Sequence, residues 1–330
     1  MVERPTPLDL DPLRKRVPTT PEILALCREY GLGDLVNVCG RLGGLLNVNI
    51  KVETTAGLYV IRVMSGLATI EHLRYAERIT TVLQNAGMPA LTPLRNQEGE
   101  IYSTLEGRIV QVHPFAEGKE FSYKPEQAYA CGHMLHRLHE ALAEVEPGPT
   151  PKWSNYPSKE TLEEGLSRLR VLSSVVPPEQ IDEAHRLYED ISGRWEIVAK
   201  NLPVTVIHGD WHPWNQLYSD GEVSCILDFD FVQRAERMHD VAYALWAMLS
   251  DMTKWHMGES LLKGYGIMFP EELDALPTAI ARASIFFVCT ASFTENPMNE
   301  LAVQLERQCP FIEWVLSGEG ERTMRWMCRS

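Results

Sequence analysis

The hydrophobic and polar positions divide the chain into a β-like part and a longer helical part. Up to about residue 115, short β-branched runs with partial alternation are separated by Gly43-Gly44 and Ala56-Gly57, which is typical of antiparallel strands joined by tight turns. Thr20 is the expected N-cap of a first helix. The expected elements are helices at 20–30 and 68–86, and strands at 35–42, 46–54, 57–64, 100–106 and 107–114.

After residue 115 the apolar positions follow a helical period, with a strand-like interruption at 204–231. The pattern therefore predicts an α+β protein with a polar tail at 1–20, a β-rich domain at 21–113 and a helical domain at 114–330. Helices are expected at 124–145, 161–176, 179–202, 240–250, 258–269, 275–293 and 302–318.

Composition narrows the class of protein. Hydrophobic residues make up 45% and charged residues 23% of the 330 residues, as in ordinary globular proteins. The net charge of −14 argues against a nucleic-acid partner. Seven scattered cysteines without a CxxC pair argue against a disulfide framework or a structural zinc site. We find neither a signal peptide nor an apolar run of roughly 20 residues, so we expect a cytoplasmic protein without a membrane partner.

The strand-like segment carries the candidate chemistry. An apolar strand at 204–208 leads to Asp210, Asn215 follows five residues later, and a second strand at 223–227 ends at Asp228. We interpret this as a strand–loop–strand hairpin with acids at its loop side. Phosphoryl transfer needs a base near the acceptor hydroxyl and oxygen ligands for Mg²⁺. Asp210 is the candidate base, and Asn215 and Asp228 are the candidate metal ligands.

The pattern HGDxxxxN followed by ILDFD resembles the aminoglycoside phosphotransferase and choline kinase-like family, which includes homoserine kinase type II-like enzymes. The match covers His208, Gly209, Asp210, Asn215 and Asp228. The resemblance implies a protein-kinase-like fold of two lobes. A small antiparallel-sheet lobe would bind ATP, and a larger helical lobe would carry the catalytic and metal loops and the pocket for a small hydroxylated acceptor.

The resemblance also implies a phosphate-binding cation in a strand of the type YVIxV. Residues 59–63 match this type, and Arg62 stands where the family usually has Lys. Arg keeps the charge and can bind phosphate in a bidentate manner. Lys51 is the fallback. A helix carboxylate should orient the cation, and we prefer Glu77 to Glu71, although either could be a solvated surface residue.

The other nucleotide contacts follow from order along the chain. A glycine pair between strands can let backbone amides approach phosphates, but a left-handed turn explains it equally well. The expected contacts are Gly43, Gly44 and Asn47 near the phosphates, Gln111 and His113 at a hinge beside the adenine, and Ile61 and Phe115 against its ring.

Aromatic and acidic residues near the predicted loop are candidates for the acceptor pocket. Aromatic rings can bind an amine by cation–π contact, but filling the core is the commoner role of tryptophan. The tryptophans are Trp211, Trp214, Trp246 and Trp255, and the acids that an amine could meet are Asp230, Glu236 and Glu295.

Two further residues are expected to support the loop. His208 should brace it through hydrogen bonds to the backbone rather than react. Asp240 should either anchor the loop or cap a helix that begins at Val241.

Three functions fit these residues. The first is an ATP- and Mg²⁺-dependent kinase of a small molecule, such as an amino alcohol, an antibiotic or a homoserine-like metabolite. The second is a nucleotide-binding pseudokinase with a scaffold or regulatory role, which Arg62 favours and the retained Asp210, Asn215 and Asp228 oppose. The third is a metal-dependent hydrolase, for which the sequence offers too few ligands at metal spacing. The sequence does not indicate an oligomeric state.

Overall fold

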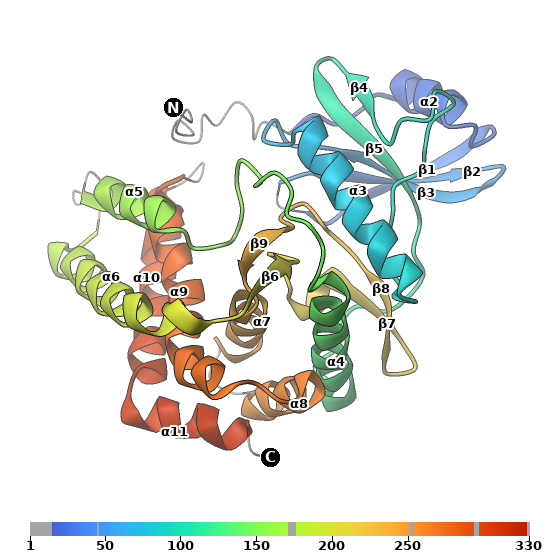
Figure 1. Cartoon of the computed structure of the whole chain (residues 1–330). Helices are drawn as coiled ribbons and strands as arrows, with labels where there is room; N and C mark the ends of the chain where they lie inside the picture. The colour runs from blue at the N-terminus through green and yellow to red at the C-terminus, as the bar shows by residue number, and fades with distance from the viewer. Residues whose placement is uncertain (1–14, 45, 171–175, 251–253, 294–296, 329–330) are drawn as a thin grey trace. The chain divides into compact units, whose positions relative to one another are not determined.

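The structure is a computed structural model that describes residues 15–44, 46–170, 176–250, 254–293 and 297–328 (Figure 1). The chain forms two compact units. Unit 1 comprises the described residues up to Gly118 together with the segments 148–153 and 225–230, and unit 2 comprises the remainder. The first boundary between the compact units lies after Gly118, whereas the sequence pattern placed the domain boundary after residue 113.

Unit 1 is built on a five-stranded antiparallel sheet with the strand order β1-β2-β3-β5-β4. Each strand and helix predicted between residues 20 and 114 is present. The elements are α2 (Thr20–Glu29), β1 (Leu35–Leu42), β2 (Val48–Thr54), β3 (Gly57–Val63), α3 (Ile70–Asn85), β4 (Ser103–Leu105) and β5 (Arg108–Pro114). The predicted N-cap at Thr20 is wrong by one residue: Thr19 is the N-cap, and its backbone N–H donates to the Glu22 carboxylate at 2.8 Å.

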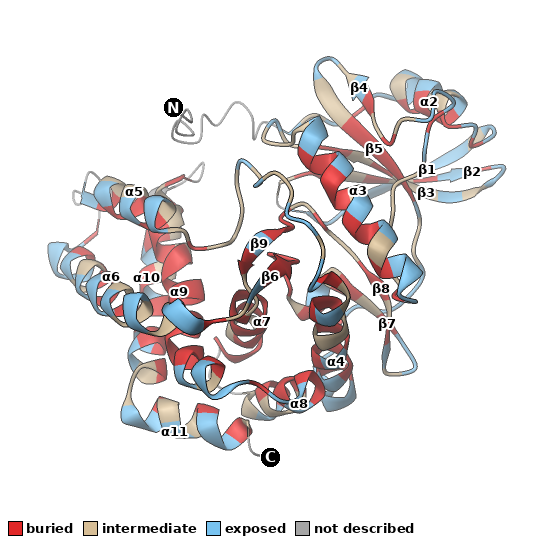
Figure 2. Ribbon diagram, viewed as in Figure 1, coloured by how far each residue is buried: buried red, intermediate tan, exposed pale blue. Residues whose placement is uncertain are grey.

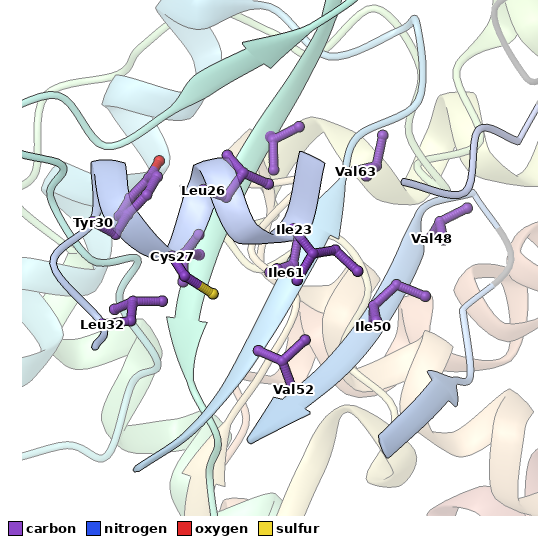
Figure 3. Close-up of a cluster of buried hydrophobic side chains, with 12 residues drawn as sticks. Ile23, Leu26, Cys27, Tyr30, Leu32, Val48, Ile50, Val52, Ile61 and Val63 are labelled. Atoms are coloured by element: carbon purple, nitrogen blue, oxygen red, sulfur yellow. The ribbon is translucent and has the colours of Figure 1, made fainter. Parts of the chain in front are cut away.

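Alternation along these strands separates an apolar face from a polar face of the sheet. Apolar side chains of β2, β3 and β5 pack with the buried side of α2 (Figure 3). Most of the polar side chains of these strands stand at the intervening positions and belong to the opposite face. This core consists of Ile23, Leu26, Cys27, Tyr30, Leu32, Val48, Ile50, Val52, Ile61, Val63, Val110 and Val112, and the polar positions are Asn49, Lys51, Arg62, Gln111 and His113.

The strands around the predicted catalytic loop pair differently from the prediction. The expected hairpin between 204–208 and 223–227 is wrong, because β6 (Val204–Ile207) pairs with β9 (Gln233–Glu236), and β7 (Gln216–Ser219) pairs with β8 (Glu222–Ile226). The reason lies in the turn after β7. Asp220 and Gly221 have φ of 52° and 87°, the left-handed pair that closes a tight two-residue hairpin.

Unit 2 is mainly helical. Helices α4 and α8 approach closely at two glycines: a Cβ on Gly132 would lie 2.0 Å from the Leu261 carbonyl oxygen, and one on Gly264 would lie 2.0 Å from that of Tyr129. The apolar pattern did not predict the last helix, Gly318–Met327. The helices are α4 (Pro125–Leu142), α5 (Lys159–Leu169), α6 (Pro178–Val198), α7 (Met238–Leu249), α8 (Trp255–Tyr265), α9 (Pro270–Thr290), α10 (Pro297–Val315) and α11 (Gly318–Met327), with short 3-10 turns at Ala199–Asn201, Pro213–Asn215 and Ala291–Phe293.

Helix α9 is the central helix of unit 2. It is buried along most of its length, whereas α5, α6 and α11 each expose one face (Figure 2). The expectation that no segment reaches membrane-spanning length is wrong. Pro270–Phe293 passes that test by length and composition, and 83% of its apolar window is buried inside the protein, as in the core helix of a globular domain.

Candidate active site

A buried carboxylate holds the start of the candidate catalytic loop in unit 2. Asp240 is fully buried in the first turn of α7 and accepts hydrogen bonds from the backbone N–H groups of His208 (2.8 Å) and Gly209 (2.9 Å). His139 Nε2 lies 3.3 Å from the same carboxylate. Burial favours the neutral acid, but the His139 hydrogen bond and neighbouring charges outweigh it and lower the pKa of Asp240. Asp240 therefore anchors the loop, and the capping alternative is wrong because α7 begins at Met238.

The loop can follow this path only with glycine at position 209. Gly209 has φ of +80°, a conformation that side chains other than glycine rarely adopt. A Cβ there would lie 2.3 Å from the carbonyl oxygen of Phe231. The glycine of the HGD pattern is thus required both by backbone conformation and by close packing.

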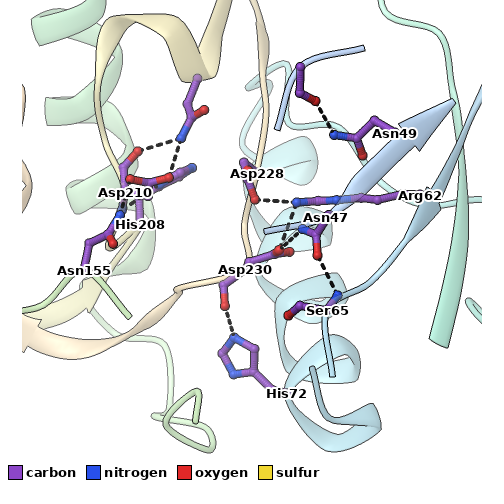
Figure 4. Close-up of polar contacts among 12 residues, drawn as sticks. Asn47, Asn49, Arg62, Ser65, His72, Asn155, His208, Asp210, Asp228 and Asp230 are labelled. Atoms are coloured by element: carbon purple, nitrogen blue, oxygen red, sulfur yellow. Dashed lines mark hydrogen bonds and ion pairs between the residues drawn. The ribbon is translucent and has the colours of Figure 1, made fainter. Parts of the chain in front are cut away.

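Neutral amides orient the Asp210 carboxylate (Figure 4). Asn155 Nδ2 donates to Oδ1 at 2.6 Å, and Asn215 Nδ2 donates to Oδ2 at 2.8 Å and to the Asp210 carbonyl oxygen at 2.9 Å. Asn155 also lies 3.2 Å from the Tyr243 hydroxyl. Burial and then the charge of Asp210 raise the pKa of Tyr243 well above its ordinary value, so this phenol stays neutral. The carboxylate is held in one orientation, as a general base requires.

His208 lies inside the protein, between the β6 strand and Asp210. Its Nδ1 accepts a hydrogen bond from the Asp210 backbone N–H at 3.3 Å, and its ring packs edge-on against Trp211. These contacts agree with the bracing function expected of His208, and its place in the catalytic site stays a prediction.

In unit 1, one guanidinium joins the two acids that follow β8. Arg62 Nη2 lies 2.7 Å from Asp228 Oδ1 and 2.9 Å from Asp230 Oδ2 (Figure 4). Asn47 Nδ2 donates to the same Asp230 oxygen at 2.7 Å. Burial raises the pKa of Asp230, and Arg62 opposes that effect. We call Arg62, Asp228, Asp230 and Asn47 the Arg62 cluster.

Two further contacts fix the backbone around this cluster. The Ser65 N–H donates to Asn47 Oδ1 at 2.9 Å. His72, buried in α3, has Nε2 at 2.8 Å from the Asp230 carbonyl oxygen and Nδ1 at 3.1 Å from that of Pro149. The segment that carries the predicted metal ligand is thus tied to α3 and to the sheet of unit 1.

Asp228 has a strained backbone and an accessible carboxylate. Its φ is +62°, in the left-handed region that few residues other than glycine occupy, and its side chain is 37% exposed. Such strain costs on the order of 1–3 kcal/mol and concentrates at functional sites. The strain aims a carboxylate outward at the end of a strand, as a metal ligand must be.

The predicted nucleotide residues Arg62, Gln111 and His113 share the polar face of the sheet, where Arg62 is the cross-strand partner of Gln111. Both ring nitrogens of His113 are buried and have no hydrogen-bond partner among the described residues. Burial and then the charge of Arg62 lower the pKa of His113 to about 3, so the ring is neutral. A water or a ligand could complete the hydrogen bonding of this neutral imidazole, and the nucleotide-binding assignments of His113 and Gln111 stay predictions.

Other predicted nucleotide residues have partners within unit 1. Glu77 pairs with Arg95, whereas the carboxylates described beside Arg62 are Asp228 and Asp230. Asn49 Nδ2 donates to the Gly43 carbonyl oxygen at 2.8 Å, and Gly44 has φ of +138°. The Lys51 ammonium lies 3.7 Å from the centre of the Phe115 ring. The nucleotide-binding assignments of Glu77, Gly43, Gly44 and Asn47 stay predictions.

The four candidate tryptophans divide into two pairs. Trp211 is fully buried in the core, whereas Trp255 is half-buried and packs on Trp314 with ring centroids 4.3 Å apart. Trp214 and Trp246 line a pocket of unit 2.

The described candidate acids for an amine already have partners within their own units. Asp230 is engaged by Arg62 and Asn47, and Glu236 accepts the Tyr156 hydroxyl at 2.6 Å. Glu295 lies outside the described residues.

Sequence reasoning missed Asn155 and Tyr243 altogether and considered Asp230 only as an amine ligand. Asn155 lies in an irregular segment between α4 and α5, and nothing in its local pattern marks it. The closeness of Asp230 to Asp228 in the sequence was the available signal for a shared site.

Comparison with known proteins identifies the family. The model of the phosphotransferase enzyme family matches residues 38–275. A homoserine kinase of Bradyrhizobium sp. (strain BTAi1 / ATCC BAA-1182) is 26% identical over 294 residues, which cover 82% of this chain and 82% of the relative.

Solved kinases share the fold. A microcompartment-associated aminopropanol kinase superposes with a TM-score of 0.74 at 16% identity, covering 92% of this chain and all of the other. An amicoumacin kinase in complex with AMP-PNP and Ca²⁺ gives 0.66 at 14% identity, covering 89% and 96%. These matches confirm the predicted kinase-like fold and the resemblance from which the prediction began.

Proposed function

Because the chain belongs to this phosphotransferase enzyme family, we propose that it transfers the γ-phosphoryl group of ATP to a hydroxyl of a small molecule, with the help of Mg²⁺. The observation that carries the proposal is the Asp210 carboxylate, held by two amides on a loop that Asp240 anchors. Names among the similar proteins, a homoserine kinase and an aminopropanol kinase, support a small acceptor with an alcohol group.

The chemistry follows from the groups present. Asp210 accepts the proton of the acceptor hydroxyl while the oxygen forms a bond to the γ-phosphorus and the bond to the β,γ-bridging oxygen breaks, which releases ADP. Asn155 and Asn215 hold the carboxylate for this transfer. Arg62 binds phosphate oxygens, for which it exchanges its bonds to Asp228 and Asp230.

The oxygen donors fit magnesium. Asp228 offers an accessible carboxylate and Asn215 a carboxamide oxygen, both hard ligands of the kind Mg²⁺ prefers. Among the described residues, no group of three or more His, Cys, Asp or Glu residues could hold a metal ion. The proposed site therefore has two protein ligands, and Mg²⁺ usually keeps waters and phosphate oxygens in its remaining positions. When bound, the ion neutralises charge on the phosphates. Asp228 and Asn215 would hold it.

The test is a coupled ADP-release assay against amino alcohols, aminoglycosides and homoserine. Asp210→Asn should reduce turnover by about a hundredfold to ten-thousandfold, the usual contribution of a general base, while ATP and Mg²⁺ still raise the melting temperature. The matched control is Asp220→Asn in the exposed β7–β8 turn, which should keep full activity.

Asp228→Ala should lose the Mg²⁺-dependent part of the thermal shift. If Asp210→Asn retains turnover, the base is misassigned. If ATP shifts the melting temperature but no alcohol of a broad panel releases ADP, the pseudokinase alternative is favoured.

A further inference from the structure

Unit 2 contains a pocket with an aromatic wall and a cationic end. Its volume is about 310 Å³. This lies at the lower end of the range of small-molecule sites, so the pocket suits a compact ligand. His212, Trp214, Tyr243, Trp246 and Phe287 supply the aromatic wall, and Arg307 with Ser250 forms the other end.

The pocket adjoins the candidate base. His212, which lines it, has Nε2 3.8 Å from Asp210 Oδ1. Tyr243, also in its wall, contacts Asn155, which donates to the same carboxylate oxygen, Asp210 Oδ1. A hydroxyl compound seated there would present its oxygen to Asp210. The inference therefore rests on the proposed function and concerns the acceptor of that reaction.

The aromatic wall is tightly packed. Trp246 and Phe287 stack with centroids 4.2 Å apart and planes 9° apart, and Tyr243 packs on Trp246 at 5.3 Å. Tyr123, another lining residue, has a left-handed backbone with φ of +56° and packs edge-on against Trp214. For a bulky residue this conformation is rare and costly. The strain is offset by the aromatic contacts, and the wall suits a flat ring or an apolar chain.

The charge of the pocket points to the second property of its ligand. Arg307 is the charged lining residue in the described part of unit 2, and no described lining residue is acidic. Its Nη2 donates to the Ser250 hydroxyl at 2.8 Å, which fixes the guanidinium at the pocket end. The whole chain has a net charge of −14, whereas the charged lining residue of this pocket is a cation. The charge of the pocket is therefore opposite to that of the protein as a whole.

We propose that the acceptor is a hydroxylated carboxylate: an apolar or aromatic body packs on Trp246 and Tyr243, Arg307 and Ser250 bind its carboxylate, and its hydroxyl meets Asp210. A guanidinium and a carboxylate form a charge-assisted pair, whereas an ammonium there would be repelled. Tyr123 offers no open ring to an amine, because the Lys254 ammonium lies 3.8 Å from its centre. Polycationic aminoglycosides are therefore poor acceptors.

The experiment compares three alcohols that differ only in charge: para-(hydroxymethyl)benzoate, the corresponding benzamide and the corresponding benzylamine. Their binding to the full-length protein is measured by isothermal titration calorimetry, with L-homoserine and its uncharged alcohol homoserinol as an aliphatic pair. The benzoate should bind about tenfold or more tightly than the amide, as expected for a hydrogen bond to a charged group.

In Arg307→Gln that preference should disappear while binding of the benzamide is unchanged. Arg194→Gln is the matched control, because Arg194 is an exposed arginine of α6 that pairs with Asp190 and does not line the pocket. It should behave as the wild type. Arg307→Glu should reverse the order and favour the benzylamine, which a merely structural effect would not do.

The outcomes separate this inference from the proposed function. Arg307-dependent binding of a carboxylate without ADP release from any alcohol defeats the kinase proposal and overturns the assignment of that carboxylate as a phosphate acceptor, although it leaves a carboxylate-binding pocket. Turnover of amines or neutral alcohols that is indifferent to Arg307→Gln upholds the kinase and overturns the inference. Failure of both the benzoate and L-homoserine to bind also overturns it.

Discussion

The two polar clusters of the candidate active site are built in opposite ways. The Arg62 cluster of unit 1 relies on ion pairs, since one guanidinium serves both Asp228 and Asp230. The Asp210 carboxylate of unit 2 is held by neutral amides, on a loop whose backbone N–H groups bond to Asp240. Shared charges can exchange partners when a ligand arrives, whereas neutral donors dedicated to one carboxylate keep it in place.

The difference matches the tasks proposed for each cluster. A phosphate-binding arginine must be able to pair with a new anion. A metal-binding aspartate must be able to pair with a new cation. The ion pair between them can therefore break when ligands bind. A general base gains from a fixed orientation, because a small displacement of the reacting atoms is costly. Unit 2 should therefore be preorganised at Asp210, and the contacts of Arg62 in unit 1 should be exchangeable.

The largest effect is expected at Asp240. Asp240→Ala removes the acceptor of two buried backbone N–H groups and the partner of His139, which should cost about 3–5 kcal/mol in the free energy of unfolding. Urea denaturation measures the loss. Asp240→Asn keeps one oxygen acceptor and should lose less.

Asp274→Ala is the control, because it removes an exposed partner of Arg325 and should change the unfolding free energy by no more than about 0.5 kcal/mol. An Asp240→Ala protein as stable as the wild type would show that the loop does not depend on this anchor.

A smaller effect is expected at Arg62 and should fall on nucleotide binding. Arg62→Gln should raise the KM for ATP by about ten- to hundredfold, since a charge-assisted hydrogen bond to phosphate is lost. Arg62→Lys should recover part of the affinity. Steady-state kinetics with varied ATP measure both.

Arg74→Gln provides the comparison, because Arg74 is an exposed arginine of α3 whose partner is Glu100. Equal KM values for the wild type and Arg62→Gln would mean that Arg62 serves only to balance Asp228 and Asp230.

The smallest effect concerns His113 in acid. Its pKa is lowered from 6.5 to about 3 in the folded protein, so stability is complete above 6.5, falls as the unfolded state takes up a proton, and stops falling below about 3. When the pH is lowered from about 7 to about 5.5, His113 should reduce the free energy of unfolding by about 1 kcal/mol.

His113→Gln should remove that part of the pH dependence, as measured by urea unfolding at the two pH values. The difference between the two values is compared, so any constant cost of the substitution cancels. An unchanged slope with pH would show that His113 is accessible to protons in the folded state.

Sequence reasoning succeeded where the period of the pattern is local. The sheet and helices of unit 1 follow from alternation and turn residues, and the HGDxxxxN spacing located Asp210 and Asn215 on one loop, where they bond. Reasoning failed where partners are distant. A tight turn at Asp220-Gly221 pairs β7 with β8 and leaves β6 to pair with β9. The sequence pattern instead favoured a longer hairpin between 204–208 and 223–227.

The partner of Arg62 shows the same limit. A helix acid was expected, but Glu77 pairs with Arg95, and Asp230, 168 residues away, contacts the guanidinium. Asn155 reaches Asp210 across 55 residues. No periodicity encodes such pairs, because they depend on how separate elements pack rather than on spacing within one element.

The discontinuity of unit 1 has a consequence for synthesis on the ribosome. Its sheet is complete in sequence by Pro114, yet Asp228 and Asp230 emerge more than a hundred residues later. Until then the buried side chains of Arg62 and Asn47 lack these acceptors. The nascent sheet therefore waits, at typical rates of about 5–20 residues per second, for several seconds before its charges are balanced. A fragment ending near Gly118 is accordingly an incomplete domain, and chaperones would meet this intermediate in every round of translation.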